Sequence, residues 1–192
     1  MAKSESLPYY AGQAFQNVPD GRCVFIPWYG LQGTGPHFAQ YMGLPQDLRL
    51  VRTNAGLRLS RLPVRELEML RDGDGVAFER FEGELVEGRV VVEPTDATRI
   101  SLDLRGVKVV YDPRQERLSC AGESVYWPLR GGKLDVRFFL DRQGLECFSA
   151  SGFDCWAFRQ AQPNPNSRRL SSSVTAAKSA TCVAWKLKSI WK

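Results

Sequence analysis

Apolar and polar residues alternate along the stretch from Lys133 to Phe148. The apolar positions of its first half are Leu134, Val136, Phe138 and Leu140. A period of two residues is typical of a strand with one face in a core and one face in water. Residues 141–144 (DRQG) then supply turn residues, and residues 145–148 begin a second apolar run. The stretch therefore predicts a β-hairpin.

Further strand-like runs follow one another from Gly73 onward, separated by Gly, Pro, Asp or Asn. These runs are 76–83, 84–94, 99–106, 107–112, 116–122, 133–148, 153–160 and 181–191. Such regular spacing predicts an all-β fold, a two-sheet antiparallel β-sandwich. Lysines alternate with apolar residues in the last run, which is typical of a solvent-facing or edge strand. Residues 162–173 (QPNPNSRRLSSS) are predicted to form a polar surface loop.

The first third of the chain predicts two hairpins and a short helix. Residues 9–30 read as two strands around Asp20-Gly21, which is a strong hairpin signal between apolar runs. Residues 48–59 alternate leucine with arginine around a TNAG tip, and a one- to two-turn helix follows Pro63. We therefore expect an N-terminal extension over 1–62, a linker helix over 63–72 and the sandwich over 73–192.

Composition excludes several classes of protein. The chain of 192 residues has a net charge of +5, and its 19 arginines are scattered rather than gathered into a basic block. We therefore expect no nucleic-acid partner. No run of about 18 apolar residues exists, so we expect no membrane span. The start of the chain contains no secretory signal, which indicates a cytoplasmic protein or one whose native start is missing.

The cysteine and histidine content argues against metal and cofactor chemistry. The five cysteines form no CxxC pair, and we expect them to be buried free thiols. Cys147 and Cys155 flank a turn and are placed to face one another across a hairpin. His37 is the only histidine, which leaves little room for a catalytic triad or a histidine metal site. We expect neither a metal site nor a cofactor.

Several segments, in order, resemble the C-terminal part of glycoside hydrolase family 32, the invertases, inulinases and levanases. The segments are YYAGQAF with DGRCVFIPW, YMGLPQDLRL, LRLSRLPVRELEMLR, VVYDPRQERL, LDVRFFLDRQGLECFSASG and WKLKSIW. The resemblance implies the last strands of a catalytic propeller followed by the β-sandwich of that family. It covers nearly all of the chain.

The chain departs from the family where the catalytic residues would be. The family's "WMNDPNG" nucleophile motif has no counterpart in this sequence. Asp112-Pro113 follows Tyr111 rather than arginine, and Glu146-Cys147 resembles the family's acid/base dipeptide. Both lie downstream of the GLPQDL segment, whereas the family's catalytic motifs lie upstream of it. We therefore expect both pairs to be structural and assign no catalytic residue.

Four residues are candidates for contacting a sugar. In the family geometry Trp28 corresponds to a tryptophan near the mouth of the sugar pocket, with Tyr10 in the neighbouring strand. Aromatic faces suit sugar rings, whose C–H surfaces pack against them. Trp127 is predicted to form an exposed aromatic platform, with Arg130 and Asp154 as hydrogen-bonding neighbours. Trp185 and Trp191 are expected to lie in the core or an interface.

The leading interpretation is a non-catalytic β-sandwich module with a structural or carbohydrate-binding role, its ligand a fructan or another oligosaccharide. One alternative is part of a split or truncated β-fructofuranosidase that is active only with a propeller-bearing partner. A second alternative is a lectin-like glycan binder, since fold does not determine function. Apolar surface is expected along residues 9–62, where a second copy or a catalytic partner chain would bind.

Overall fold

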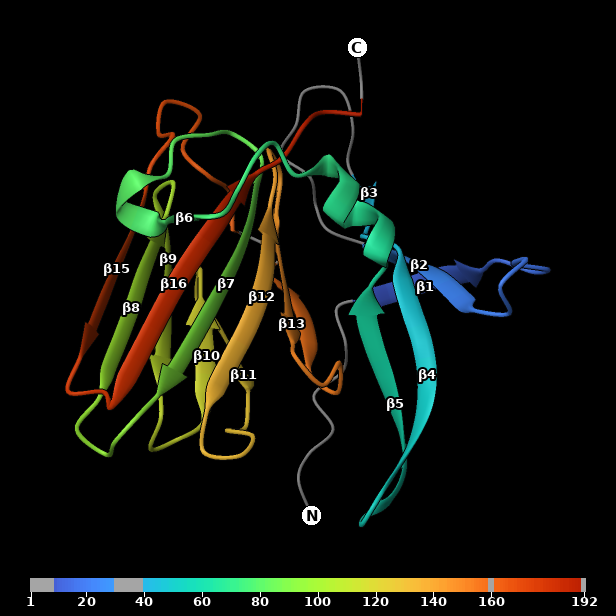
Figure 1. Cartoon of the computed structure of the whole chain (residues 1–192), viewed down its shortest axis with the longest axis horizontal. Coiled ribbons are helices and arrows are strands. Elements are labelled where there is room, and N and C mark those ends of the chain that lie inside the picture. The colour runs from blue at the N-terminus through green and yellow to red at the C-terminus, as the bar shows by residue number, and fades with distance from the viewer. Residues whose placement is uncertain (1–8, 30–39, 159–160, 191–192) are drawn as a thin grey trace.

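The computed structural model of the chain describes residues 9–29, 40–158 and 161–190, with the side chains of Tyr9 and Tyr10 excepted. Three antiparallel sheets make up the fold (Figure 1). Two of them, sheet II and sheet III, pack face to face, and sheet I lies beside them. The predicted all-β, two-sheet antiparallel sandwich is confirmed.

Sheet II has five strands in the order β11-β10-β9-β8-β15. Its strands are β8 (Arg99–Leu104), β9 (Val107–Asp112), β10 (Arg117–Cys120), β11 (Glu123–Tyr126) and β15 (Leu170–Thr175). Burial alternates along β8 and β9, so one face of the sheet enters the core and the other meets solvent.

Sheet III has six strands in the order β14-β13-β12-β7-β16-β6. Its strands are β6 (Val76–Ala77), β7 (Val86–Glu93), β12 (Leu134–Leu140), β13 (Leu145–Ser149), β14 (Cys155–Phe158) and β16 (Ser179–Lys186). The predicted hairpin at 133–148 is β12 and β13. Its turn is closed by Asp141, whose Oδ1 accepts hydrogen bonds from the amides of Gln143 (2.7 Å) and Gly144 (3.1 Å).

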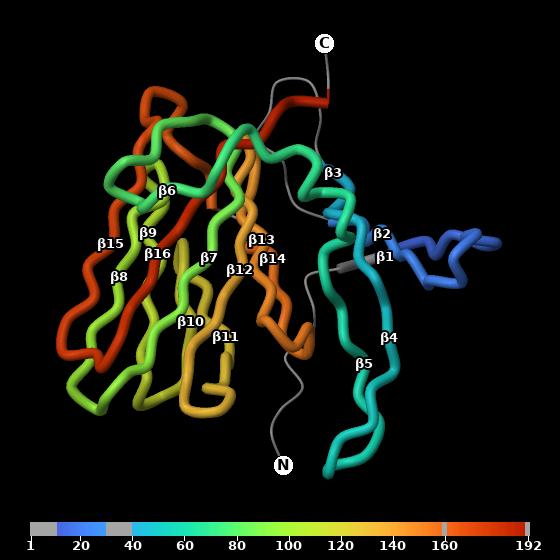
Figure 2. Tube along the Cα trace, in the orientation of Figure 1, coloured from blue at the N-terminus to red at the C-terminus, as the bar shows by residue number. Residues whose placement is uncertain are grey.

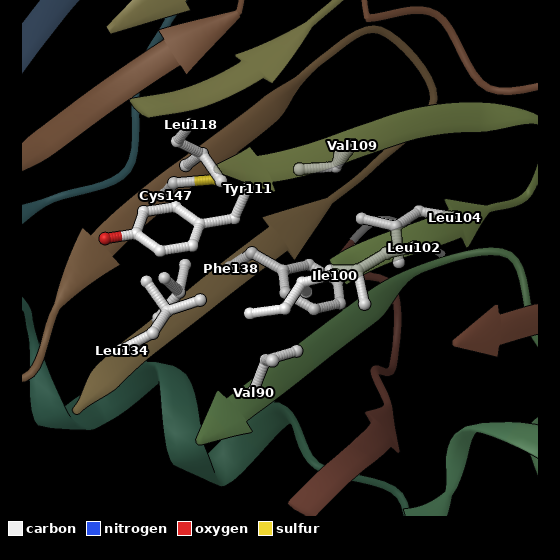
Figure 3. Close-up of a pocket in the computed structure, with 11 residues that line it drawn as sticks. Val90, Ile100, Leu102, Leu104, Val109, Tyr111, Leu118, Leu134, Phe138 and Cys147 are labelled. Carbon is white, nitrogen blue, oxygen red and sulfur yellow. The ribbon is translucent and has the colours of Figure 1, made fainter. Parts of the chain in front are cut away.

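The core lies between sheets II and III (Figure 3). The ring of Phe138 projects from β12 into its centre and meets Phe78 edge-on at 5.9 Å between centroids. Gly88 on β7 makes room for that ring, because a Cβ at this position would overlap Phe138. The interior space that remains is about 20 Å³ and is lined by apolar side chains. It has room for about one water molecule, so it is a packing gap and not a binding site.

Sheet I is the N-terminal extension, drawn in blue and cyan at one side of the sandwich (Figure 2). Its strands are β1 (Tyr9–Ala14), β2 (Cys23–Tyr29), β3 (Tyr41–Met42), β4 (Gln46–Thr53) and β5 (Gly56–Pro63). Both predicted hairpins are present, and β2 pairs with β4 to join them into one sheet.

Two short 3-10 helices complete the described part of the chain. The predicted linker helix is η1 (Arg65–Leu70), and η2 (Phe78–Arg80) lies next to β6. The run 76–83 was predicted as a strand, yet only its first two residues pair with β16. The 3-10 turn brings both Phe78 and Phe81 into the core. An extended strand would place them on opposite faces, because their positions differ by three. Neither described helix is long and apolar enough to span a bilayer.

Strand β15 corrects the prediction of a surface loop over 162–173. Leu170 and Val174 face the core, while the serines between them are exposed or half-buried. The sequence pattern did not predict this strand because its serines favour turns. The strand forms through six residue pairs with β8 at the edge of sheet II.

The two cysteines expected to face one another lie on opposite faces of sheet III. Cys155 pairs with Phe148 across the hairpin, and Cys147 pairs with Trp156. Cys147 therefore enters the core between the sheets, while Cys155 joins a separate cluster on the outer face. All five cysteines are free thiols, but Cys23 is exposed, so the expectation of general burial is wrong for it.

Replacing Gly88 with alanine should destabilise the fold by about 1–3 kcal/mol, because Phe138 must leave its position to make room for the added methyl group. Urea unfolding monitored by circular dichroism measures this change. The control is Ser101→Ala on the solvent face of sheet II, which should change the free energy of unfolding by less than about 0.5 kcal/mol. Equal stabilities of the two variants would contradict the packing described here.

Candidate functional site

The predicted sugar-contact residues of the sandwich do not form an exposed platform. Trp127 is only 2% exposed and lies in the core between the sheets. Tyr111 donates a hydrogen bond from its hydroxyl to the Trp127 carbonyl at 2.9 Å. The prediction that Trp127 is exposed is therefore wrong. Alternation along the chain turns Val125 and Trp127 inward, and it is Tyr126 that faces solvent.

The guanidinium of Arg130 forms an ion pair with Asp154, and its side chain is 43% exposed. Its Nε and Nη2 donate to both oxygens of the Asp154 carboxylate at 2.7–3.0 Å. The same guanidinium stacks on the ring of Phe153, 5.2 Å from its centroid. The two residues that the sequence analysis paired as neighbours of a sugar thus bind each other.

The other two sugar candidates belong to sheet I. Trp28 is half-buried on β2, where it pairs with Met42 of β3. Tyr10 lies on β1, but its side chain is outside the described residues. The four candidates are therefore divided between sheet I and the sandwich. His37 and Trp191 also lie outside the described residues. Within the described ranges no group of three or more His, Cys, Asp and Glu side chains is arranged to hold a metal ion.

The two dipeptides that resemble catalytic motifs contribute to the fold. Asp112 caps a turn, where its Oδ1 accepts hydrogen bonds from the amides of Arg114 (2.9 Å) and Gln115 (3.3 Å). Glu146 points away from the core, toward sheet I, and joins that sheet to the sandwich.

Glu146 is the central polar contact between sheet I and the sandwich. Its Oε2 accepts a hydrogen bond from the Tyr29 hydroxyl at 2.8 Å, and its Oε1 accepts one from the Leu44 amide at 3.0 Å. Burial is the main reason that the pKa of Glu146 rises to about 7, and the negative charge of Asp141 adds to the effect. The two hydrogen bonds act in the opposite direction but do not offset the loss of hydration.

Further contacts on both sides of Glu146 hold sheet I in place. The Ser60 hydroxyl donates to the Ser151 carbonyl at 2.8 Å, and the Arg61 amide donates to the Gly152 carbonyl at 2.7 Å. Gly152 has φ +70° and no room for a side chain, so glycine is required at this contact. An apolar cluster of sandwich residues closes the junction against Leu44, Leu67 and Leu187. Its buried members are Phe139, Phe148 and Cys155.

A groove of about 550 Å³ lies beside this junction, between sheet I with η1 on one side and the outer face of sheet III on the other. Charged side chains dominate its lining. The arginines are Arg22, Arg49, Arg65, Arg71, Arg89 and Arg137. The acidic residues are Asp47, Glu68, Glu87 and Asp135. We refer to this site as the charged groove.

The sheet III wall of the charged groove is a network of ion pairs. Arg89 and Arg137 lie directly opposite one another on β7 and β12, an arrangement of like charges that is unfavourable by itself. Asp135 offsets it by accepting two hydrogen bonds from Arg89, at 3.0 and 2.7 Å. Glu87 accepts one from Arg137 at 2.7 Å and two from Arg71, at 2.8 and 2.6 Å. The paired guanidiniums are thereby held in fixed positions.

The opposite wall is organised by Arg22. Its guanidinium donates to Asp20 and to Glu66, each at 2.6 Å, and lies 3.4 Å from Asp47. The hydrogen bonds from Arg22 hold the pKa of Glu66 at about 2, so this carboxylate stays ionised. In the sequence these arginines are scattered and form no basic block. Only the pairing of β7 with β12 and the position of sheet I gather them into one site.

Sheet I also presents an apolar outer face. Leu50 and Leu59 lie directly opposite one another on β4 and β5 and are 73% and 39% exposed, and nearby Leu57 is 54% exposed. Met42 and Val51 are further large exposed apolar residues of this sheet, and exposed Phe15 directly follows β1. The described part of residues 9–62 thus carries the exposed apolar surface that the sequence analysis expected.

The junction predicts a specific dependence of stability on pH. Because the pKa of Glu146 is raised in the folded state, the folded protein keeps a proton between pH 4.5 and 7 that the unfolded chain releases. This contribution to stability is fully present below pH 4.5 and is lost as the pH rises through 7. Wild type should therefore lose about 3 kcal/mol relative to Glu146→Gln between pH 4.5 and 8. Urea unfolding of both proteins measures the difference, and parallel pH profiles would contradict it.

No protein-family model matches the sequence. A levanase from Bacillus sp. (strain L7) is 30% identical over 70 residues, which cover 33% of this chain and 7% of the levanase. The similarity in sequence is thus local.

Solved structures match nearly the whole chain. An exo-inulinase from Aspergillus awamori superposes with a TM-score of 0.79 at 16% identity, over 96% of this chain and 44% of the enzyme. A sucrose-6-phosphate hydrolase from Lactobacillus gasseri matches with a TM-score of 0.71 at 21% identity, over 95% and 42%. A glycoside hydrolase family 32 β-fructofuranosidase from Bombyx mori matches with a TM-score of 0.65 at 21% identity, over 94% and 41%.

The chain spans less than half the length of each of these three enzymes. The matched region contains all three sheets, because it covers at least 94% of the chain. The resemblance stated from the sequence is thereby confirmed: this chain has the fold of one part of the glycoside hydrolase family 32 enzymes.

Proposed function

We propose that the chain is a non-catalytic β-sandwich module of a fructan- or sucrose-hydrolysing glycosidase. In this proposal it supports a propeller-bearing catalytic part and binds it through sheet I. The observation that carries the proposal is the exposed apolar face of β4 and β5, on a sheet that the Glu146 junction fixes to the sandwich.

The leucines of this face favour association. Burying apolar surface yields about 25 cal/mol per Å², so covering Leu50, Leu57 and Leu59 contributes several kcal/mol, on the order of 1–2 kcal/mol each. The fixed sheet also lowers the cost of binding, because the partner does not have to order it. An apolar face on a rigid support is therefore suited to a stable contact between two protein parts.

The positions of the carboxylates support a non-catalytic role. A retaining glycosidase needs two carboxyl groups about 5–5.5 Å apart on either side of the scissile bond. Of the two candidate carboxylates, Asp112 caps a turn on sheet II and Glu146 is buried in the junction of sheet III. Both accept structural hydrogen bonds, and Glu146 is buried in the junction with only 7% of its surface exposed.

In the alternative, a split β-fructofuranosidase, the chain would bind its catalytic partner through the same apolar face of sheet I. The fold comparisons support this alternative because the chain covers only 41–44% of each enzyme. An open reading frame directly upstream that encodes a "WMNDPNG"-type segment would favour it, and co-expression with that polypeptide should then produce activity. The lectin-like alternative predicts glycan binding without any preference for fructans.

The first test is hydrolysis by the purified chain. We expect no release of fructose or glucose from sucrose, inulin or levan, because neither carboxylate candidate is placed for catalysis. Released reducing sugar measures the activity, with a commercial invertase as the positive control. Hydrolysis above the rate of a heat-denatured sample would overturn the non-catalytic proposal.

The second test concerns the apolar face. Without its catalytic partner the chain should self-associate at high concentration, and Leu50→Lys with Leu59→Lys should restore a monomer. Sedimentation velocity over a concentration series measures the change. The control is Val110→Lys on sheet II, an exposed apolar residue outside sheet I, which should leave association unchanged. A wild-type monomer at every concentration would contradict this role for sheet I.

A further inference from the structure

The outer half of the β4–β5 hairpin projects away from the rest of the described chain. Residues 49–59, which we call the hairpin arm, are exposed apart from the half-buried Thr53. The tip of the arm stands clear of the sandwich (Figure 1). Given the proposed function, on which this inference rests, we propose that the arm docks on a protein surface that carries carboxylates among apolar side chains. The chemistry of the partner that sheet I binds is thereby specified.

The hairpin arm is strongly basic. It contains three arginines, Arg49, Arg52 and Arg58, and the chain has no acidic residue between Asp47 and Glu66. The arm therefore has a charge of +3, which is more than half of the net charge of +5 of the whole chain. A local excess of positive charge on a protein surface favours the approach of an acidic partner.

None of these three arginines forms an ion pair with a described residue. Two of them donate no hydrogen bond within the described ranges, and Arg58 donates one, from Nη1 to the Leu57 carbonyl at 3.0 Å. By contrast, Arg22 and Arg71 in the neighbouring charged groove each bind carboxylates of the chain. Arginine suits ion pairs at interfaces, because its guanidinium is weakly hydrated and can bind a carboxylate through two parallel hydrogen bonds. The described chain thus supplies no carboxylate for the cations of the arm.

Apolar and cationic residues share both faces of the arm. Residues directly opposite one another in an antiparallel pair point to the same face. Arg52 lies opposite Leu57 on the leucine face, and Arg58 lies opposite Val51 on the reverse face. A bilayer meets only one face of such a ribbon, and the phosphates of a nucleic acid would leave its apolar side chains uncovered. A protein surface can contact both faces and both kinds of side chain, so the distribution favours a protein.

A second copy of the chain is a poorer partner than an acidic protein. A two-fold dimer brings the same patch of both copies together, so two arms with a charge of +3 would meet. Like charges across an interface oppose association. Self-association through this face should therefore strengthen with added salt, because screening weakens the repulsion. Binding to an acidic partner should weaken with added salt, so the sign of the salt effect distinguishes the two partners.

Fluorescence anisotropy of two labelled peptides, titrated with the whole chain, tests the proposal. One peptide alternates leucine with glutamate and the other alternates leucine with lysine, each about 8 residues long and spanning roughly 26 Å as a strand. We expect the Leu-Glu peptide to bind and the Leu-Lys peptide not to bind. Arg52→Glu with Arg58→Glu should weaken binding of the Leu-Glu peptide at least about tenfold, because attraction becomes repulsion. Salt at about 0.5 M, where the screening length falls to about 4 Å, should also weaken it.

The matched control reverses two charges outside sheet I. Arg80 and Lys108 are exposed and form no ion pair with the described residues. Arg80→Glu with Lys108→Glu changes the net charge by the same amount as the arm variant. This control should bind the Leu-Glu peptide within about twofold of wild type, because distant exposed charges are screened. Thermal denaturation monitored by circular dichroism should show both double variants folded like wild type.

Equal binding of the two peptides would overturn the proposal, and so would equal losses in the two double variants. Tighter binding to phosphatidylserine vesicles or to a DNA duplex than to the Leu-Glu peptide would also overturn it, by identifying a lipid surface or a nucleic acid as the partner. A chain that self-associates through Leu50 and Leu59 but does not bind the Leu-Glu peptide would contradict the acidic partner and leave the proposed function intact. The two failures are therefore distinguishable.

Discussion

The arrangement of this molecule depends on one buried carboxyl group. Glu146 extends from the outer face of sheet III and accepts hydrogen bonds from Tyr29 and from the Leu44 amide, both in the N-terminal part of the chain. A carboxyl group without a cationic partner is costly to bury, so these hydrogen bonds and the apolar cluster beside them must compensate. With the contact formed, sheet I has a defined position beside the sandwich.

Two surfaces result from that position. On one side, sheet I and η1 stand over the outer face of sheet III and enclose the charged groove. On the other, β4 and β5 present their leucines to solvent. The groove and the apolar face are thus consequences of one junction, and a change at Glu146 would affect both.

The two faces of sheet III differ in composition and surroundings. Its inner face fills the core with side chains such as Phe138, for which Gly88 leaves the space. Its outer face carries charged residues that would be solvated in an isolated sheet but are brought together here as ion pairs, with Glu87 almost completely buried. Buried ion pairs contribute little to stability compared with apolar packing. They give the charged groove a fixed polar lining.

Local pattern by itself determined the sandwich strands and the hairpins, because alternation and turn residues act over a few neighbouring positions. It also identified Glu146 as a structural residue. It failed where distant segments decide the outcome. Serine-rich β15 forms only because β8 offers it an edge, and Trp127 is buried because sheet III covers it. Nothing in the sequence indicated the charged groove, because its walls come from segments up to about 160 positions apart. Only the tertiary structure brings their side chains together.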